Sequence, residues 1–282
     1  MNFMKKFNWG YLLLIPGLGF ILFFIVIVCY KMIAQSIGFY NYAGESYFTL
    51  KYWMGLWNQT LFDDLWFTFW MAFMTATVSL ILTYLLCFIL QKTPGKKTFL
   101  SLFKVPLFVP GLVAAFLITN VIDYQGLLNL VLQGLHIIEE PLKLRNDDAG
   151  IGCLIVNVWK NVPFQLLILY SAVDSVRKDI KDAALNLGAT KIALALKIVI
   201  PISFPSAMSA YLMSFIRTFN DYAVAKTTGP LYPTTLTNLM YLQAYSFSDW
   251  NSAACIGVLM IIAAFVFVIA YTYVTKKIMQ YT

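Results

Sequence analysis

The sequence predicts an all-α membrane protein with six transmembrane helices. Of its 282 residues, 60% are hydrophobic and 12% are charged, whereas about a quarter of the residues of a soluble domain are charged. Six stretches hold the ~20 predominantly apolar residues that a helix needs to cross the bilayer core. They are Tyr11–Ile33, Leu65–Gln91, Phe99–Asp123, Ala149–Val173, Ile202–Ala225 and Asn251–Thr275.

The first stretch follows Lys5 and Lys6, as the apolar part of a signal peptide would. Its apolar core is longer than that of a typical signal peptide, and no small-x-small cleavage site follows it, which favours a retained helix. We therefore expect an N-terminal helix and external loop over residues 1–64, a core domain over residues 65–275, and a short tail over residues 276–282.

The charges of the loops predict the orientation of the helices. Basic side chains gather at both termini and in alternate loops: Lys5, Lys6, Lys92, Lys96, Lys97, Arg177, Lys178, Lys181, Lys191, Lys197, Lys276 and Lys277. The other loops are mostly acidic, with Glu45, Asp63, Asp64, Glu139, Glu140, Asp147, Asp148 and Asp249 against Lys51, Lys143, Arg145 and Lys226. Because short cytoplasmic loops carry the excess of Lys and Arg, we expect both termini in the cytoplasm.

Two external loops have apolar segments that we expect at the membrane surface, one of them aromatic and the other helical. The aromatic run from Phe48 to Trp53 is expected at the headgroup level, where Trp and Tyr rings are favoured. Residues 126–138 place apolar side chains at helical spacing, which predicts a short amphipathic helix on the outer surface. These side chains are Leu127, Leu128, Val131, Leu132 and Leu135. An ordinary packed loop is the alternative.

The composition argues against a metal centre or a disulfide framework. Cys29, Cys87, Cys153 and Cys255 lie within apolar stretches and show no paired spacing. With one histidine, His136, a multi-histidine metal site is excluded. We expect no metal and no cofactor in this chain.

The polar break from Asp174 to Pro201 separates the fourth and fifth apolar stretches. Residues 179–187 form a good helix candidate, with Ile180, Ala183, Ala184 and Leu187 on one stripe. Gly188 can adopt the left-handed conformation that ends a helix, and residues 191–200 resume a helix until Pro201. Such a projecting, partly apolar element is either a contact surface for a partner or a surface linker without one.

The break resembles the EAA loop of the membrane subunits of type I ABC importers. The resemblance is carried by Asp182-Ala183-Ala184, Gly188-Ala189 and the ending Ile198-Val199-Ile200-Pro201. Asp182 stands where that pattern usually has Glu, which keeps the charge on a side chain one methylene shorter. The motif Trp159-x-x-x-Pro163-Phe164, the pair Pro106 and Pro110, and Gly126-x-x-Asn129 are similar to the same superfamily.

The resemblance implies a type I (MetI-like) permease core in a prokaryotic plasma membrane. Its cytoplasmic loop, residues 174–201, would dock into a groove on an ATPase through Asp182, Ala183, Ala184, Leu187, Gly188, Ala189 and Pro201. It also implies a homologous second permease, expected to be a different chain, two ATP-binding cassette ATPases and an extracytoplasmic substrate-binding protein. No nucleic-acid partner is expected, since the formal charge of +7 lies in short clusters between the apolar stretches.

The sequence gives no sign of an ATP site of its own. Residues 94–98 lack the spacing of a G-x-x-x-x-G-K-[ST] run. ATP and Mg²⁺ are therefore expected on the separate ATPase, and this chain is expected to be non-catalytic. A stand-alone secondary carrier is the rival, although no inverted repeat is visible.

The solute is suggested by two short runs. Leu187-Gly188-Ala189 is closer to the loop of the polyamine, ferric-ion, phosphonate and thiamine importers than to the Asp-Gly-Ala run of carbohydrate permeases. The run Phe48-Thr49-Leu50-x-Tyr52 resembles the same group. A carbohydrate permease remains the alternative.

Polar residues within the apolar stretches mark a candidate translocation path. Charged groups in a membrane span usually face a bundle interior or an aqueous cavity. The candidates are Asn120, Asn157, Lys160, Ser214, Arg217, Asn220 and Asp221. Arg217 and Asp221 are spaced i, i+4 and can pair on a helix. The alternative is that these groups hold the bundle together by ion pairs and interhelical hydrogen bonds.

Overall fold

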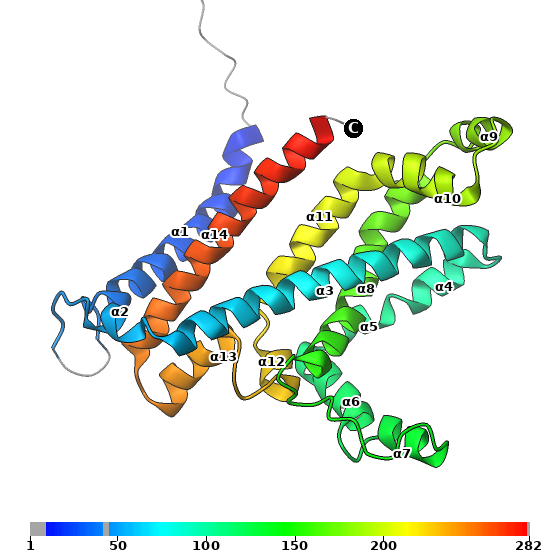
Figure 1. Cartoon of the computed structure of the whole chain (residues 1–282). Coiled ribbons are helices and arrows are strands. Elements are labelled where there is room, and N and C mark those ends of the chain that lie inside the picture. The colour runs from blue at the N-terminus through cyan, green and yellow to red at the C-terminus, as the bar shows by residue number, and fades with distance from the viewer. Residues whose placement is uncertain (1–9, 42–44, 281–282) are drawn as a thin grey trace, which may run out of the picture. The chain divides into compact units, whose positions relative to one another are not determined.

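The computed structural model describes residues 10–41 and 45–280, and helices joined by loops make up this part of the chain (Figure 1). Lys5 and Lys6 lie outside the described residues. The helices of the first half are α1 Gly10–Ser36, α2 Lys51–Leu56, α3 Gln59–Lys92, α4 Lys96–Leu102, α5 Val105–Phe108, α6 Gly111–Ile122 and α7 Leu127–Gly134. Those of the second half are α8 Ile151–Asp174, α9 Lys178–Asn186, α10 Lys191–Leu194, α11 Ile200–Phe219, α12 Ala223–Thr228, α13 Leu236–Tyr241 and α14 Trp250–Gln280, with π-helical turns at Ala195–Val199 and Leu242–Ser246.

Six helical segments of the described chain are long and apolar enough to cross a membrane. They are Pro16–Ser36, Gln59–Gln91, Gly111–Gly134, Ile151–Asp174, Lys191–Phe219 and Trp250–Gln280. The predicted fold class, an all-α protein with six transmembrane segments, is confirmed.

The third predicted span, residues 99–123, is not one helix but the three short helices α4, α5 and α6. Proline explains the break, because it lacks an N–H and disfavours helical backbone in the residue before it. Val109, which precedes Pro110, is extended, with φ −82° and ψ 120°. A regular helix resumes at Gly111.

The described chain forms two compact units. The first comprises residues 1–58 and 240–262, and the second residues 59–239 and 263–282. In the first unit, the start of α14 is tied to the end of α1. The Asn251 side chain donates to the carbonyl of Gln35 at 2.9 Å, and the Cys255 thiol donates to that of Ser36 at 3.3 Å.

The second unit is built on the packing of α3, α8 and α11. Small side chains line the face of α3 that packs on the other two helices, which allows close approach of the backbones. The buried small residues of α3 include Ala72, Thr75, Ala76, Ser79 and Thr83, and those of α11 include Ser203, Ala207, Ala210, Ser214 and Thr218. The polar break and the candidate path residues of the spans therefore lie within one unit.

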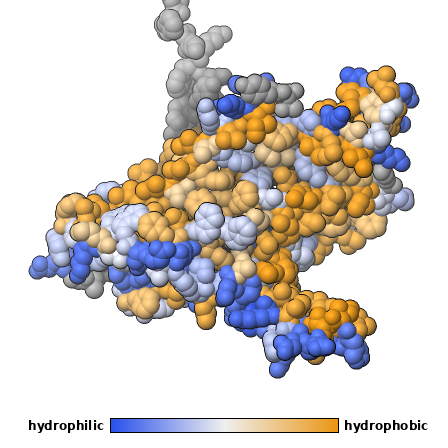
Figure 2. All heavy atoms as spheres, viewed as in Figure 1, coloured by the Kyte–Doolittle hydropathy of each residue, from blue (hydrophilic) through white to orange (hydrophobic). Residues whose placement is uncertain are grey.

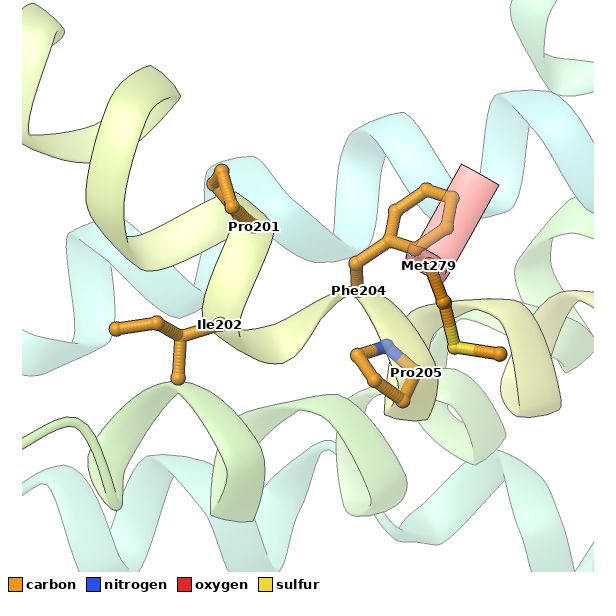
Figure 3. Close-up of a pocket in the computed structure, with 5 residues that line it drawn as sticks. All are labelled: Pro201, Ile202, Phe204, Pro205 and Met279. Atoms are coloured by element: carbon orange, nitrogen blue, oxygen red, sulfur yellow. The ribbon is translucent and has the colours of Figure 1, made fainter. Parts of the chain in front are cut away.

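Loops that the charge pattern assigns to one side of the membrane lie at one end of the second unit. The Lys96 ammonium is 3.3 Å from the Asp174 carboxylate, so the turn after α3 lies beside the start of the break. At the same end, Met279 of α14 lines a hollow of about 250 Å³ with the first turns of α11, including Pro201 and Pro205 (Figure 3). The basic tail and the polar break are therefore neighbours.

The short helix predicted within residues 126–138 is present as α7, and its position on the outer surface stays a prediction. Asn129 is buried and donates to the carbonyls of Asp123, Tyr124 and Leu142, while its own side-chain oxygen accepts from the Leu142 N–H. These bonds fix α7 to the flanking loop. Its apolar residues Leu127, Leu130, Val131 and Leu135 are exposed.

Candidate functional site

The polar break folds into two short helices joined by a glycine turn. α9 ends in a Schellman motif, in which the Gly188 N–H donates to the Leu185 carbonyl and the Ala189 N–H to the Ala184 carbonyl, each at 3.0 Å. Gly188 has φ +87°, the left-handed conformation that the sequence predicts for it. Thr190 then caps α10 by accepting a hydrogen bond from the Ala193 N–H at 3.2 Å. The turn therefore has a defined geometry.

The tip of these two helices is apolar and uncovered by the described chain. Leu187 is 89% exposed and Ile192 is 72% exposed. Leu187 belongs to the predicted stripe, whose other members Ile180, Ala183 and Ala184 are exposed or half-buried. Figure 2 shows this projecting lobe with hydrophobic surface bordered by hydrophilic residues. An apolar tip of this kind is suited to contact with another protein.

The base of the two helices, in contrast, is anchored in the core of the second unit. Val176 and Val199, at the two ends of the break, are buried in one apolar cluster with Leu169 and Val173 of α8. Arg177 pairs with Asp179 on the surface. The exposed tip is thus carried on a fixed base.

The second loop helix continues into the membrane without interruption. Helical backbone runs from Lys191 to Phe219, with a π-helical turn at Ala195–Val199 directly before Pro201. In a regular helix, the Pro201 ring would clash with the carbonyl four residues earlier, and that carbonyl would lose its hydrogen bond because proline has no N–H. The wider π turn relieves this conflict. These 29 residues stay helical throughout, and the chain changes direction between α10 and α11 (Figure 1).

The structure separates the candidate path residues into a buried group and an exposed group. Asn157 and Ser214 are buried between the helices. Ser214 accepts a hydrogen bond from Gln165 at 2.9 Å, and Asn157 accepts one from Asn161 at 2.9 Å through its carbonyl. The bond to Ser214 joins α8 to α11, whereas the hydrogen bonds of Asn157 stay within α8.

The exposed group is Asn120, Arg217 and Asn220, with Lys160 and Asp221 half-buried beside it. The Asn120 and Asn220 amides donate to carbonyls one turn back on their own helices. Polar and charged side chains of a membrane span that the chain leaves uncovered need water or a partner helix. This group remains the candidate for the path.

The predicted ion pair between Arg217 and Asp221 is wrong. None of the three ion pairs among the described side chains involves either residue. α11 ends at Phe219, so Asp221 lies beyond the helix on which an i, i+4 pair depends. Asp221 instead accepts a hydrogen bond from the Val224 N–H at 3.1 Å, and the Arg217 guanidinium lies 4.7 Å from the centre of the Phe164 ring.

Lys160 reaches from α8 towards the start of α6. A methyl group at Gly111 would lie 3.0 Å from the Lys160 Nζ, so the glycine makes room for the ammonium. In the described part of the chain, the Lys160 ammonium forms no ion pair.

One set of functional candidates was missed by the sequence reasoning, which treated Asp63 and Asp64 as loop charges. Asp64 is buried and accepts a hydrogen bond from the Thr234 N–H at 2.7 Å, and Thr68 accepts one from the Leu236 N–H at 2.9 Å. The sequence signals that could have suggested this contact are Asp64 and Thr68, one turn apart at the start of a helix, and the distant run Pro233-Thr234-Thr235.

The chain matches one protein family and is similar to known permease proteins. The model of the family described as "Binding-protein-dependent transport system inner membrane component" matches residues 85–280. The spermidine/putrescine transport system permease protein PotB of Escherichia coli (strain K12) is 25% identical over 226 residues, which cover 79% of this chain and 82% of PotB. The trehalose/maltose transport system permease protein MalF of Thermococcus litoralis is 24% identical over 286 residues, covering 97% and 94% of the two chains.

A solved structure shares the fold. It is a chain of a bacterial ABC transporter involved in the import of the acidic polysaccharide alginate, with a TM-score of 0.76 at 14% identity, covering 97% of this chain and 98% of that one. The region matched by the family model begins within α3 and includes the polar break and α14.

Proposed function

Because this chain belongs to the family of binding-protein-dependent transport system inner membrane components, we propose that it forms half of the translocation pathway of an ATP-driven importer. The exposed Leu187 tip on the anchored loop is the observation that carries the proposal. This tip would give a separate ATPase an apolar surface to bind. ATP and Mg²⁺ would be bound by that ATPase, and this chain would be non-catalytic.

The proposed mechanism follows from the continuity of the loop with α11. Closure of two ATPases around ATP would displace the α9–α10 tip, and the helical segment from Lys191 to Phe219, which is continuous with α11, would carry the displacement into the membrane. Rocking of this chain against a homologous second permease would then alternate access to the path. Arg217, Asn220 and Asn120 would line it, since the chain itself leaves them uncovered.

The proposal includes an orientation. The loop, the turn after α3 and the C-terminal tail would face the cytoplasm of a prokaryotic cell, and the N-terminus would do so as well. The excess of basic residues in these segments supports this assignment. The opposite end would face an extracytoplasmic substrate-binding protein, which delivers the solute.

For the solute, we propose a small polar compound of the polyamine, phosphonate, ferric-ion or thiamine type. The PotB relative and the Leu187-Gly188-Ala189 run support this choice. A sugar is the second candidate, because the MalF relative covers 97% of this chain. Ligand binding by the partner substrate-binding protein decides between them, and a sugar ligand would overturn the first choice.

Co-purification from detergent, followed by transport in liposomes, tests the proposed coupling. We expect an ATPase to co-purify with the wild-type chain and to be lost from a Leu187→Asp variant, because a charge at an 89% exposed apolar contact must be desolvated on docking. The matched control is Leu102→Asp, which is 61% exposed on α4. Transport by the purified chain alone, driven by an ion gradient, would show that it is a secondary carrier instead.

A further inference from the structure

Two basic side chains of the candidate path lie at the same level of the helix bundle. The Asn161 amide of α8 donates to the Thr218 hydroxyl of α11 at 3.3 Å. Lys160 and Arg217 directly precede these two residues in the chain. The Arg217 guanidinium also lies 4.7 Å from the centre of the Phe164 ring, which shares a face of α8 with Lys160 at i, i+4 spacing. The two cations therefore lie close together where α8 meets α11.

This pair of cations lies deep within the membrane-spanning part of the chain. α8 begins at Ile151, so about 14 Å of helix separates Lys160 from the start of the span, at ~1.5 Å per residue. The bond from Asn161 to Thr218 puts Arg217 at the same depth, although Arg217 is near the end of α11 at Phe219. Charges at this depth are costly unless water, a partner or a bound ion compensates them.

The described residues do not neutralise the two cations. Neither Lys160 nor Arg217 forms an ion pair with a described carboxylate. Asp221, the acid that follows Arg217 in the chain, accepts a hydrogen bond from the Val224 N–H at 3.1 Å. Even if Asp221 is counted with them, two positive charges against one negative charge leave a net charge of +1. An anion could therefore balance this group.

The surroundings of the two cations leave their donors available. A methyl group at Gly111, the first residue of α6, would lie 3.0 Å from the Lys160 Nζ and 3.7 Å from the Ala223 Cβ, so glycine keeps space beside the ammonium. Arg217 is exposed and lies over the Phe164 ring, a contact that leaves the N–H groups at the guanidinium edge able to donate. A guanidinium binds two oxygens of a phosphate-like group at once, and an ammonium adds a point charge.

We propose that Lys160 and Arg217 bind the anionic group of the solute as it crosses the membrane, and that this group is a phosphonate or phosphate. The inference rests on the proposed function and narrows its range of solutes. Arg and Lys side chains select anions in pores, because fixed positive charges attract an anion and repel a cation. A polyamine at this level would be repelled by both side chains, and a neutral sugar would leave both charges uncompensated.

The test uses the assembled transporter in proteoliposomes, with its binding protein outside and ATP inside. The labelled probes are methylphosphonate, inorganic phosphate, spermidine and maltose, and we expect ATP-dependent uptake of at least one of the two oxyanions. Arg217→Gln and Lys160→Gln should each lower that uptake by ~10-fold or more, because a charge-assisted hydrogen bond to the anion is lost. Arg217→Lys should retain a larger share than Arg217→Gln, because it keeps the positive charge.

The matched control is Lys104→Gln, which removes an exposed charge between α4 and α5 and should leave uptake as in the wild type. Oxyanion uptake that neither glutamine variant reduces, or that Lys104→Gln reduces equally, would overturn the inference. An equal loss in Arg217→Lys and Arg217→Gln would do so as well. Loss of the second permease from the purified Arg217→Gln and Lys160→Gln complexes would instead assign the two cations to the contact between permeases.

The same experiment separates this inference from the proposed function. ATP-dependent uptake of spermidine or maltose in place of the oxyanions would overturn the inference and leave the importer function intact. Uptake of none of the four probes by a complex that retains its ATPase would likewise overturn the inference alone. A wild-type chain that neither co-purifies with an ATPase nor supports ATP-dependent uptake would overturn both.

Discussion

Replacing Gly188 with valine tests whether the proposed ATPase docking of the α9–α10 loop, residues 174–201, depends on its glycine turn. Gly188 has φ +87° and no atom within 4 Å of an added Cβ, so the substitution introduces backbone strain without a clash. A β-branched residue in the left-handed region costs about 2 kcal/mol. A penalty of that size lowers the equilibrium constant for forming the native turn by a factor of ~30.

The assay is ATP-driven solute uptake and solute-dependent ATP hydrolysis in proteoliposomes. We expect Gly188→Val to lose most of the coupling between the two while the chain still inserts and assembles. Gly188→Asn should retain it, because asparagine tolerates the left-handed region. The matched control is Gly95→Val, since Gly95 also has a positive φ, +74°, and open space around it.

Two outcomes would refute this reasoning. Full coupling in Gly188→Val would show that the turn geometry does not matter for docking. An equal loss in Gly95→Val would show that strain anywhere at this end of the unit impairs the transporter, and that the loop has no special role.

Three further predictions concern residues within the spans. Asp64→Ala should lower the free energy of unfolding by ~1–3 kcal/mol, because the buried N–H of Thr234 loses its acceptor; an unchanged melting temperature in detergent would show that this hydrogen bond does not stabilise the fold. Gln165→Leu should lower the melting temperature without changing solute selectivity, since its bond to Ser214 is structural; altered selectivity would return Ser214 to the path. Lys160→Met should change the uptake rate by ~10-fold or more with little effect on melting, as expected for a charge at a path; normal uptake would remove Lys160 from it.

The spans and the α9–α10 loop follow from local physics that can be read along the chain. Apolar length determines which segments cross a bilayer, and the stripe of Ile180, Ala183, Ala184 and Leu187 determines the helix of the loop. Gly188 was predicted to end that helix because a chain of L-residues needs glycine for a positive φ, and it does so. The interruption of the third span is also local in origin, because Pro106 and Pro110 act on their own backbone and on the residue before them.

Interactions between distant segments could not be predicted in this way. Asn157 and Arg217 look alike as polar residues in apolar stretches, yet one is buried against its neighbours and the other is exposed, because helix rotation is set by packing. The Arg217–Asp221 pair failed because α11 ends two residues before Asp221. The bond from Thr234 to Asp64 spans 170 positions of the chain, and only the folded packing of α3 against the loop brings those two groups within hydrogen-bonding distance.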